Sequence, residues 1–136
     1  MPDDEDISEL EELFYEGTDL HGEGRADEAL AVFEKCLAVD SNYKDALLGK
    51  AMVLLSQDMF DEALAVAHRI VELDPDDILA YTNLSMFYQR AGKIPEAEEA
   101  GAKARMLDWK RQLESGEAAG PPPTGPVKMP SKDVEK

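Results

Sequence analysis

The stretch GRADEA at residues 24–29 has two counterparts in the chain, DMFDEA at 58–63 and GKIPEA at 92–97. Each stretch ends in an alanine, and the successive alanines stand 34 residues apart. A fixed period of this length is typical of stacked helical repeats. The period therefore predicts an all-α fold, in which a single repeat cannot bury its apolar face and neighbouring repeats pack together.

Alignment on these alanines divides the chain into three repeat units, which are 10–43, 44–77 and 78–111. Each unit splits into two helical segments at a turn residue, and these turn residues are Gly24, Asp58 and Gly92. Acidic residues follow each turn, as suits the N-terminus of a helix with its partial positive charge. Each unit is therefore expected to form a helix–turn–helix hairpin.

Small residues mark the places where the two helices of one hairpin should approach closely, because a large side chain there would push the helix axes apart. The expected pairs are Gly17 with Ala29, Ala51 with Ala63, and Ser85 with Ala97. The large side chains expected to fill the remaining space are Phe33, Phe60, Tyr81 and Tyr88. Cys36, the single cysteine, occupies a packing position and is expected to be a buried apolar side chain.

The 136 residues, 43% of them apolar, suffice for one domain of ordinary size. We expect the repeats to fill residues 10–114, after an acidic lead-in at 1–9 and before a Pro- and Gly-rich tail at 115–136. Asp6 or Ser8 is expected to cap the first helix. The tail is expected to be disordered, as a flexible or polyproline-II segment. Residues 123–126 formally match a short proline-recognition ligand, although the composition favours a plain tail.

With this alignment the chain resembles the tetratricopeptide repeat, whose unit favours an aromatic residue or Leu, then Leu, Gly, Tyr, Ala, Phe, Ala and Pro at set offsets. In the first unit those offsets hold Leu13, Glu16, Gly17, Leu20, Ala29, Phe33, Cys36 and Ser41. In the second they hold Leu47, Lys50, Ala51, Leu54, Ala63, Ala67, Ile70 and Pro75. In the third they hold Tyr81, Leu84, Ser85, Tyr88, Ala97, Gly101, Ala104 and Trp109. The resemblance covers residues 10–111 and implies a right-handed α-solenoid of three helix–turn–helix hairpins.

The third unit departs from the pattern, because Trp109 stands where the resembled family has a helix-ending proline. The last helix is therefore expected to continue past Trp109 and to stop at Ser115-Gly116. Arrays of this kind often end in a capping helix, and no clear one follows here. The candidate exposed interface on the last helix comprises Met106, Trp109 and Leu113. The alternative is that Trp109 folds back on the last hairpin.

The formal net charge of −16 argues against nucleic acid as a partner, since phosphate binding requires a basic surface. It equally disfavours an anionic membrane surface. Residues 1–23 carry ten acids and no Lys or Arg. This acidic segment either forms a solvated helix face or attracts a basic segment of a partner. The start lacks the features of a secretory signal and no apolar run could span a membrane, so we expect a cytoplasmic setting.

The resemblance also implies a concave groove, which in the family is lined by the first helices of successive hairpins and takes a peptide or a partner helix. The groove residues implied here are Phe14, Tyr15, Thr18, Leu48, Gly49, Met52, Leu55, Leu79, Asn83 and Met86. The same helix faces carry Glu11, His21, Asp45, Thr82 and Gln89. Adaptable methionines suit the apolar side chains of a partner. The alternative is that some of these residues pack internally.

One well-known activity of the family clamps the C-terminal carboxylate of a peptide with Lys, Asn and Arg side chains. The clamp offsets are occupied here by Phe14, Thr18, Gly49, Leu79 and Asn83. Four of these five lack the needed polar or cationic group, so the sequence argues against a carboxylate clamp.

The chain contains no phosphate-binding glycine loop and no nucleophile elbow, and His21 and His68 are isolated from other metal ligands. The sequence therefore predicts a non-enzymatic protein–protein interaction module without cofactor or metal: an adaptor, scaffold or assembly factor. Its partner would be a peptide or helix with apolar anchors and basic flanks. The alternative is a structural subunit that forms a homo-oligomer, or docks on another subunit, through its uncapped last helix.

Overall fold

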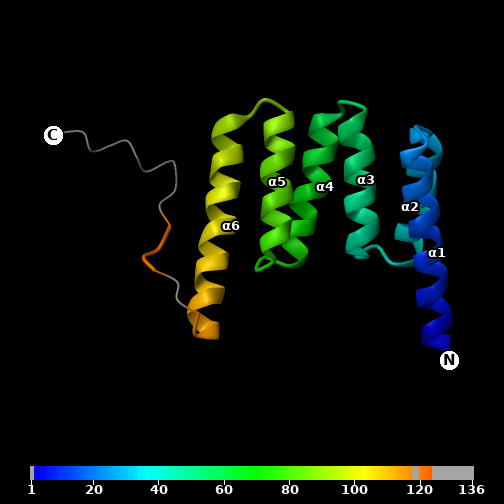
Figure 1. Ribbon diagram of the computed structural model, residues 1–136. Coiled ribbons are helices and arrows are strands. Elements are labelled where there is room, and N and C mark those ends of the chain that lie inside the picture. Colours follow the sequence, from blue (N-terminus) through cyan, green and yellow to red (C-terminus); the bar gives the residue numbers. More distant parts are fainter. Residues whose placement is uncertain (1, 118–119, 124–136) are drawn as a thin grey trace. The chain divides into compact units, whose positions relative to one another are not determined.

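The computed structural model of the protein describes residues 2–117 and 120–123 (Figure 1). Within these residues it contains no strand and six helices, which are α1 (Pro2–Gly22), α2 (Ala26–Val39), α3 (Lys44–Ser56), α4 (Phe60–Leu73), α5 (Ile78–Arg90) and α6 (Ile94–Ser115). Contacts between residues divide the chain into two compact units, Met1–Ile70 and Val71–Lys136. The predicted all-α fold of helix–turn–helix hairpins is confirmed.

A residue with positive φ ends the first helix of each hairpin. These residues are Gly24 (80°), Asp58 (60°) and Gly92 (81°), the three turn residues expected from the sequence. In each case the next N–H donates back to the carbonyl five positions earlier: Arg25 to Leu20 (2.9 Å), Met59 to Leu54 (3.0 Å) and Lys93 to Tyr88 (2.9 Å). This is the Schellman arrangement, which satisfies carbonyls left over at a helix end. The same backbone hydrogen bond is therefore made once in each repeat, at the 34-residue period of the sequence.

The connection between hairpins is also repeated, except at the end of the third unit. The N–H of Tyr43 donates to the Asp40 carbonyl at 3.1 Å, and the N–H of Asp77 donates to the Asp74 carbonyl at 3.1 Å. In the third unit α6 instead continues past Trp109 to Ser115. It stops at Gly116, whose φ is 84°. The predicted extension of the last helix and its end at Ser115-Gly116 are confirmed.

The first helix begins earlier than the sequence predicts. Because α1 starts at Pro2, the expected caps Asp6 and Ser8 lie inside the helix, and that expectation was wrong. A continuous helix over these residues requires no cap at either position, since each N–H after the first turn has an intrahelical partner. No helix among the described residues combines the length and the apolar character needed to cross a membrane.

The predicted close approach of small residues is confirmed where the structure gives a contact. Ala29, Ala63 and Ala97 are all buried. The Ser85 hydroxyl on α5 donates to the Ala97 carbonyl on α6 at 2.7 Å. The two helices of this hairpin therefore approach closely enough for a side chain on one to bond the backbone of the other.

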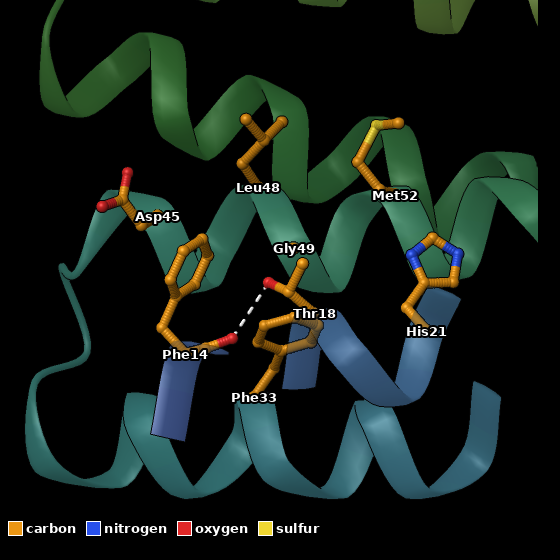
Figure 2. A pocket seen from close by; sticks show the side chains of 8 residues that line it. All are labelled: Phe14, Thr18, His21, Phe33, Asp45, Leu48, Gly49 and Met52. Carbon is orange, nitrogen blue, oxygen red and sulfur yellow. Dashed lines mark hydrogen bonds between the residues drawn. The ribbon is translucent and has the colours of Figure 1, made fainter. Parts of the chain in front are cut away.

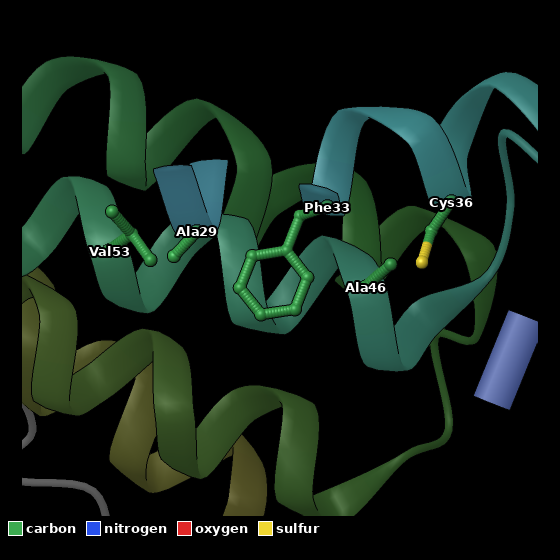
Figure 3. Close-up of a cluster of buried hydrophobic side chains, with 5 residues drawn as sticks. All are labelled: Ala29, Phe33, Cys36, Ala46 and Val53. Atoms are coloured by element: carbon green, nitrogen blue, oxygen red, sulfur yellow. The ribbon is translucent and has the colours of Figure 1, made fainter. Parts of the chain in front are cut away.

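The core of the compact unit Met1–Ile70, called the first unit from here on, forms where α1, α2 and α3 pack against one another. Figure 3 shows its buried centre, made of Ala29, Phe33, Cys36, Ala46 and Val53. Cys36 is buried as predicted, and burial raises the pKa of its thiol. The buried thiol therefore acts as a small apolar side chain.

Some core residues were not expected from the sequence. Phe87 is 0% exposed, whereas its expected neighbours in the core, Tyr81 and Tyr88, are only half-buried. Val53 and Leu55 on α3 are likewise buried. These residues lie off the single apolar stripe that helical periodicity selects, so a helix buried on more than one side is under-predicted by that criterion.

Asp58 supplies a test of the repeated turn, because it holds a left-handed conformation that glycine holds in the other two turns. An L-residue in this conformation costs about 1–2 kcal/mol, somewhat less for Asp. Asp58→Gly is therefore expected to raise the midpoint of thermal unfolding, and Asp58→Val to lower it. The converse change Gly92→Asp should lower it as well. Loss of stability in Asp58→Gly, measured by circular dichroism, would contradict this account.

Candidate functional site

A hollow of about 230 Å³ opens on the first unit and is lined by residues of three helices. Figure 2 shows the lining residues, which are Phe14, Thr18 and His21 from α1, Phe33 from α2, and Asp45, Leu48, Gly49 and Met52 from α3. Pockets that bind small molecules usually measure about 300–1,000 Å³. The hollow is therefore better matched to one bulky side chain than to a cofactor.

The lining residues from α1 and those from α3 form two walls of the hollow, and helical spacing explains why each set shares one face of its helix. Phe14, Thr18 and His21 are separated by four and three residues, which places them on one face of α1. On α3, Asp45, Leu48 and Met52 are separated by three and four residues and share a face in the same way. The Thr18 hydroxyl donates to the Phe14 carbonyl at 2.9 Å, so it is already bonded within its own helix (Figure 2).

Phe33 forms the floor of the hollow, and two glycines allow its ring to lie there. A β-carbon added at Gly17 of α1 would lie 2.7 Å from the ring, and one added at Gly49 of α3 would lie 2.5 Å from it. Both distances are far below van der Waals contact, so the ring occupies space that only glycine leaves free. Phe14 extends the aromatic surface, with its ring centroid 6.2 Å from that of Phe33.

One end of the hollow is acidic. Asp45 lies there beside Phe14 in Figure 2, and its side chain is exposed. Burial raises the pKa of the nearby Tyr43 hydroxyl, and the negative charges of Asp45 and Glu11 raise it further. Carboxylates from α1 and α3 therefore both act on Tyr43. Of the two, Asp45 lines the hollow together with Phe14, so a cation beside Phe14 would be attracted to it.

Several residues that the sequence assigned to a groove line this hollow together: Phe14, Thr18, Leu48, Gly49 and Met52. Tyr15 does not line it and is 60% exposed, with its ring centroid 5.6 Å from that of Phe14. Leu55 is 1% exposed, so its assignment to an accessible groove was wrong. It lies on a side of α3 that is buried, as the alternative of internal packing allows.

The remaining groove residues lie on α5, in the compact unit Val71–Lys136, and do not line the hollow formed by α1, α2 and α3. Leu79 is 60% exposed, whereas Asn83 and Met86 are half-buried. The residue that sequence reasoning missed is Phe33, which was expected only as a core side chain. Phe33 is both a core side chain and part of the lining of the hollow. The sequence pattern does not predict the second role, because it depends on the absence of β-carbons at two positions on other helices.

The candidate interface on the last helix has unequal exposure. Leu113 is 51% exposed, while Met106 and Trp109 are half-buried. The Trp109 indole N–H donates to the carbonyl of Gly120 at 3.0 Å. Residues 120–123 of the predicted tail thus lie against α6, while 118–119 and 124–136, which include most of the formal proline motif, lie outside the described residues.

Two sequence profiles, both described as tetratricopeptide repeat, match the chain over residues 20–85 and 78–105. The chain belongs to the tetratricopeptide repeat family. A curated relative from Hordeum vulgare, named "Probable UDP-N-acetylglucosamine--peptide N-acetylglucosaminyltransferase SPINDLY", is 33% identical over 100 residues. That match covers 68% of this chain and 11% of the relative. The tetratricopeptide repeat chain described here therefore spans about a tenth of the length of the curated relatives that it matches.

Two solved structures, one of them a tetratricopeptide repeat domain, have the same fold. PcrH in complex with the chaperone-binding region of PopB matches with a TM-score of 0.68 and 19% identity, over 80% of this chain and 88% of PcrH. The second such domain of Spaghetti (RPAP3), bound to the HSP90 peptide SRMEEVD, matches with a TM-score of 0.66 and 18% identity, over 79% of this chain and 99% of that domain. At these identities the likeness shows the fold alone.

The contact between Phe33 and Gly49 can be tested by adding one methyl group. Gly49→Ala gains up to about 1 kcal/mol of helix propensity, but overpacking a filled core typically costs about 1–3 kcal/mol. Because Gly17 also lies against the ring, we expect a net loss of stability. Gly22→Ala is the matched control, since its β-carbon would meet nothing within 4 Å. Equal urea midpoints for the two variants would contradict the tight contact.

Proposed function

We propose that this tetratricopeptide repeat chain is a protein-interaction module, and that the hollow of its first unit binds a bulky apolar side chain of a partner peptide or helix. Lys or Arg residues next to that anchor would lie at the acidic end. The observation that carries the proposal is the apolar hollow above Phe33, bordered at one end by a carboxylate. We propose that this chain shares the repeat fold with its relative named as a probable transferase, and we propose no transferase activity for it.

The apolar lining supports an anchoring role. Phe14, Leu48 and Met52 present apolar side chains beside the Phe33 ring. Covering such a surface with an apolar group is favourable by about 25 cal/mol per Å² removed from water. Met52 can adapt to anchors of different shape, since its side chain is unbranched and polarizable. Leu, Met and Phe are therefore the anchors that the hollow suits best.

The charge supports a basic partner segment. The peptide bound by the Spaghetti domain, SRMEEVD, carries three acids and one Arg. Such a peptide would meet Asp45 and the acidic surface of α1 here, so like charges would oppose its binding. Four positions that would form a carboxylate clamp carry no positive charge here, in agreement with this inference. They hold Phe14, Thr18, Gly49 and Leu79. A carboxylate clamp is therefore not part of the proposal.

Met52→Asp tests the anchor, because it places a charge in the apolar wall. Peptides first selected from a random display library against the wild-type protein should contain a Leu, Met or Phe with neighbouring Lys or Arg. Losing the apolar contact should cost about 1.5–3 kcal/mol, which weakens their affinity about tenfold to a hundredfold. Affinity would be measured by fluorescence anisotropy and folding by circular dichroism.

Met59→Asp is the matched control, since it makes the same substitution at an exposed residue immediately before α4 that does not line the hollow. Asp at that position is a favourable N-cap, so the variant should fold and bind like the wild type. Selected peptides that bind Met52→Asp as tightly as Met59→Asp would show that the hollow is not the binding site.

The acidic end makes a separate prediction. Asp45→Asn should weaken binding of the basic-flanked peptides and reduce its dependence on salt, because it removes one attractive charge from the site. Asp76→Asn changes the net charge equally at an exposed turn residue and is the control. We expect Asp76→Asn to leave the salt dependence of the dissociation constant unchanged. Equal effects of the two substitutions would attribute the attraction to net charge alone.

A further inference from the structure

A second hollow, of about 240 Å³, lies on the other unit and is formed between α6 and the segment that follows it. Its lining residues are Arg105, Asp108, Trp109 and Gln112 of α6, together with Pro121 and Pro123. The four helical residues are separated by three, one and three positions, so they share one face of α6. The Trp109 indole N–H donates to the Gly120 carbonyl at 3.0 Å, and this carbonyl immediately precedes Pro121.

The chain returns to α6 through conformations that glycine permits. Gly116 has φ of 84° and Gly120 has φ of 67°, both in the left-handed region that other residues avoid. At the first of these, the N–H of Glu117 donates to the Gln112 carbonyl at 3.0 Å, which closes the end of the helix. The residue whose carbonyl accepts from Trp109 is therefore in a conformation that favours glycine.

The side chains beside Trp109 are held in place. Gln112 donates to one carboxylate oxygen of Asp108 at 2.9 Å, and Arg111 donates to the other at 3.3 Å. These bonds lie along the same stretch of α6, so the polar border of the hollow is ordered by contacts within the helix. A surface ordered in this way loses less entropy when it binds a segment.

The chemistry of this contact is that of polyproline recognition. Proline-rich segments dock against aromatic side chains, and their carbonyls accept hydrogen bonds because the segment makes none of its own. Trp109 supplies both an aromatic surface and the N–H donor. Pro121 and Pro123 line the hollow, and Pro122 between them does not. The segment therefore presents alternate rings to the helix.

We propose that the face of α6 around Trp109 is a polyproline-binding site that is occupied by this chain's own Gly120–Pro123 segment. The segment covers part of the last helix, where the repeat pattern supplies no further hairpin. A proline-rich segment of another chain can bind there only by displacing it. This site lies on a different helix and a different unit from the hollow proposed to bind apolar anchors, so the two proposals stand independently.

Trp109 reports directly on this contact, because it is the single tryptophan of the protein. The full-length double variant Pro121→Ala, Pro123→Ala should shift the emission of Trp109 to longer wavelength and increase its quenching by acrylamide. The control Pro122→Ala removes one ring from the same segment and should leave both quantities at their wild-type values. Unchanged emission and quenching in the double variant, or an equal change in Pro122→Ala, would overturn the proposal.

A second measurement tests recognition in the absence of the tether. A synthetic peptide with the sequence of residues 117–125 should restore the wild-type emission of the double variant, and the same peptide with its prolines replaced by Ala should not. A short tether holds the native segment at an effective concentration of about 1 mM, so a peptide that binds the double variant with a dissociation constant of about 0.1 mM should bind the wild-type protein about tenfold more weakly. No restoration at millimolar peptide, or equal affinity for both proteins, would overturn the proposal.

Discussion

The Phe33 ring lies in the space that two missing β-carbons leave between α1 and α3. Gly17 and Gly49 each bring a helix backbone so close to the ring that an added methyl group would overlap it. A ring enclosed in this way joins three helices at one point, because it belongs to α2 and touches α1 and α3. It also fixes how near those helices lie, and interiors packed at this density do not relax around an extra atom without strain. The rest of the first unit is arranged around this contact.

The same contact sets the chemistry of the surface above it. Since α1 and α3 meet over Phe33, their outward faces form the two walls of one hollow, with Phe14 on one side and Leu48 and Met52 on the other. Asp45 is carried to the end of this hollow by the helix that also supplies Gly49. An apolar floor and a nearby carboxylate favour a partner segment that combines an apolar anchor with a basic neighbour. Packing inside the unit and recognition on its surface thus depend on the same few residues.

The compact unit Val71–Lys136 contains the third repeat, which differs from the first two in how its second helix ends. The first two repeats each close with a turn, whereas α6 continues through Trp109 to Ser115. The longer helix carries Trp109 in its C-terminal half, where the indole N–H donates to Gly120 and adjoins a hollow lined by Pro121 and Pro123. A terminal repeat has an apolar side without a neighbour. Here the proline segment Gly120–Pro123 of the same chain lies against α6.

The sequence by itself determined the period, the hairpin turns at Gly24, Asp58 and Gly92, the buried alanines and the end of the last helix, because each of these depends on residues within a few positions of one another. The family resemblance that the sequence shows also pointed to most residues that line the hollow, and helical spacing places them on common faces. Only the tertiary structure decided that Leu55 is buried, that Phe33 lies between two glycines, and that Gly120–Pro123 lies on Trp109. Each of these depends on which surfaces of separate segments meet, and that is decided by the fit of side chains in three dimensions, which local periodicity does not encode.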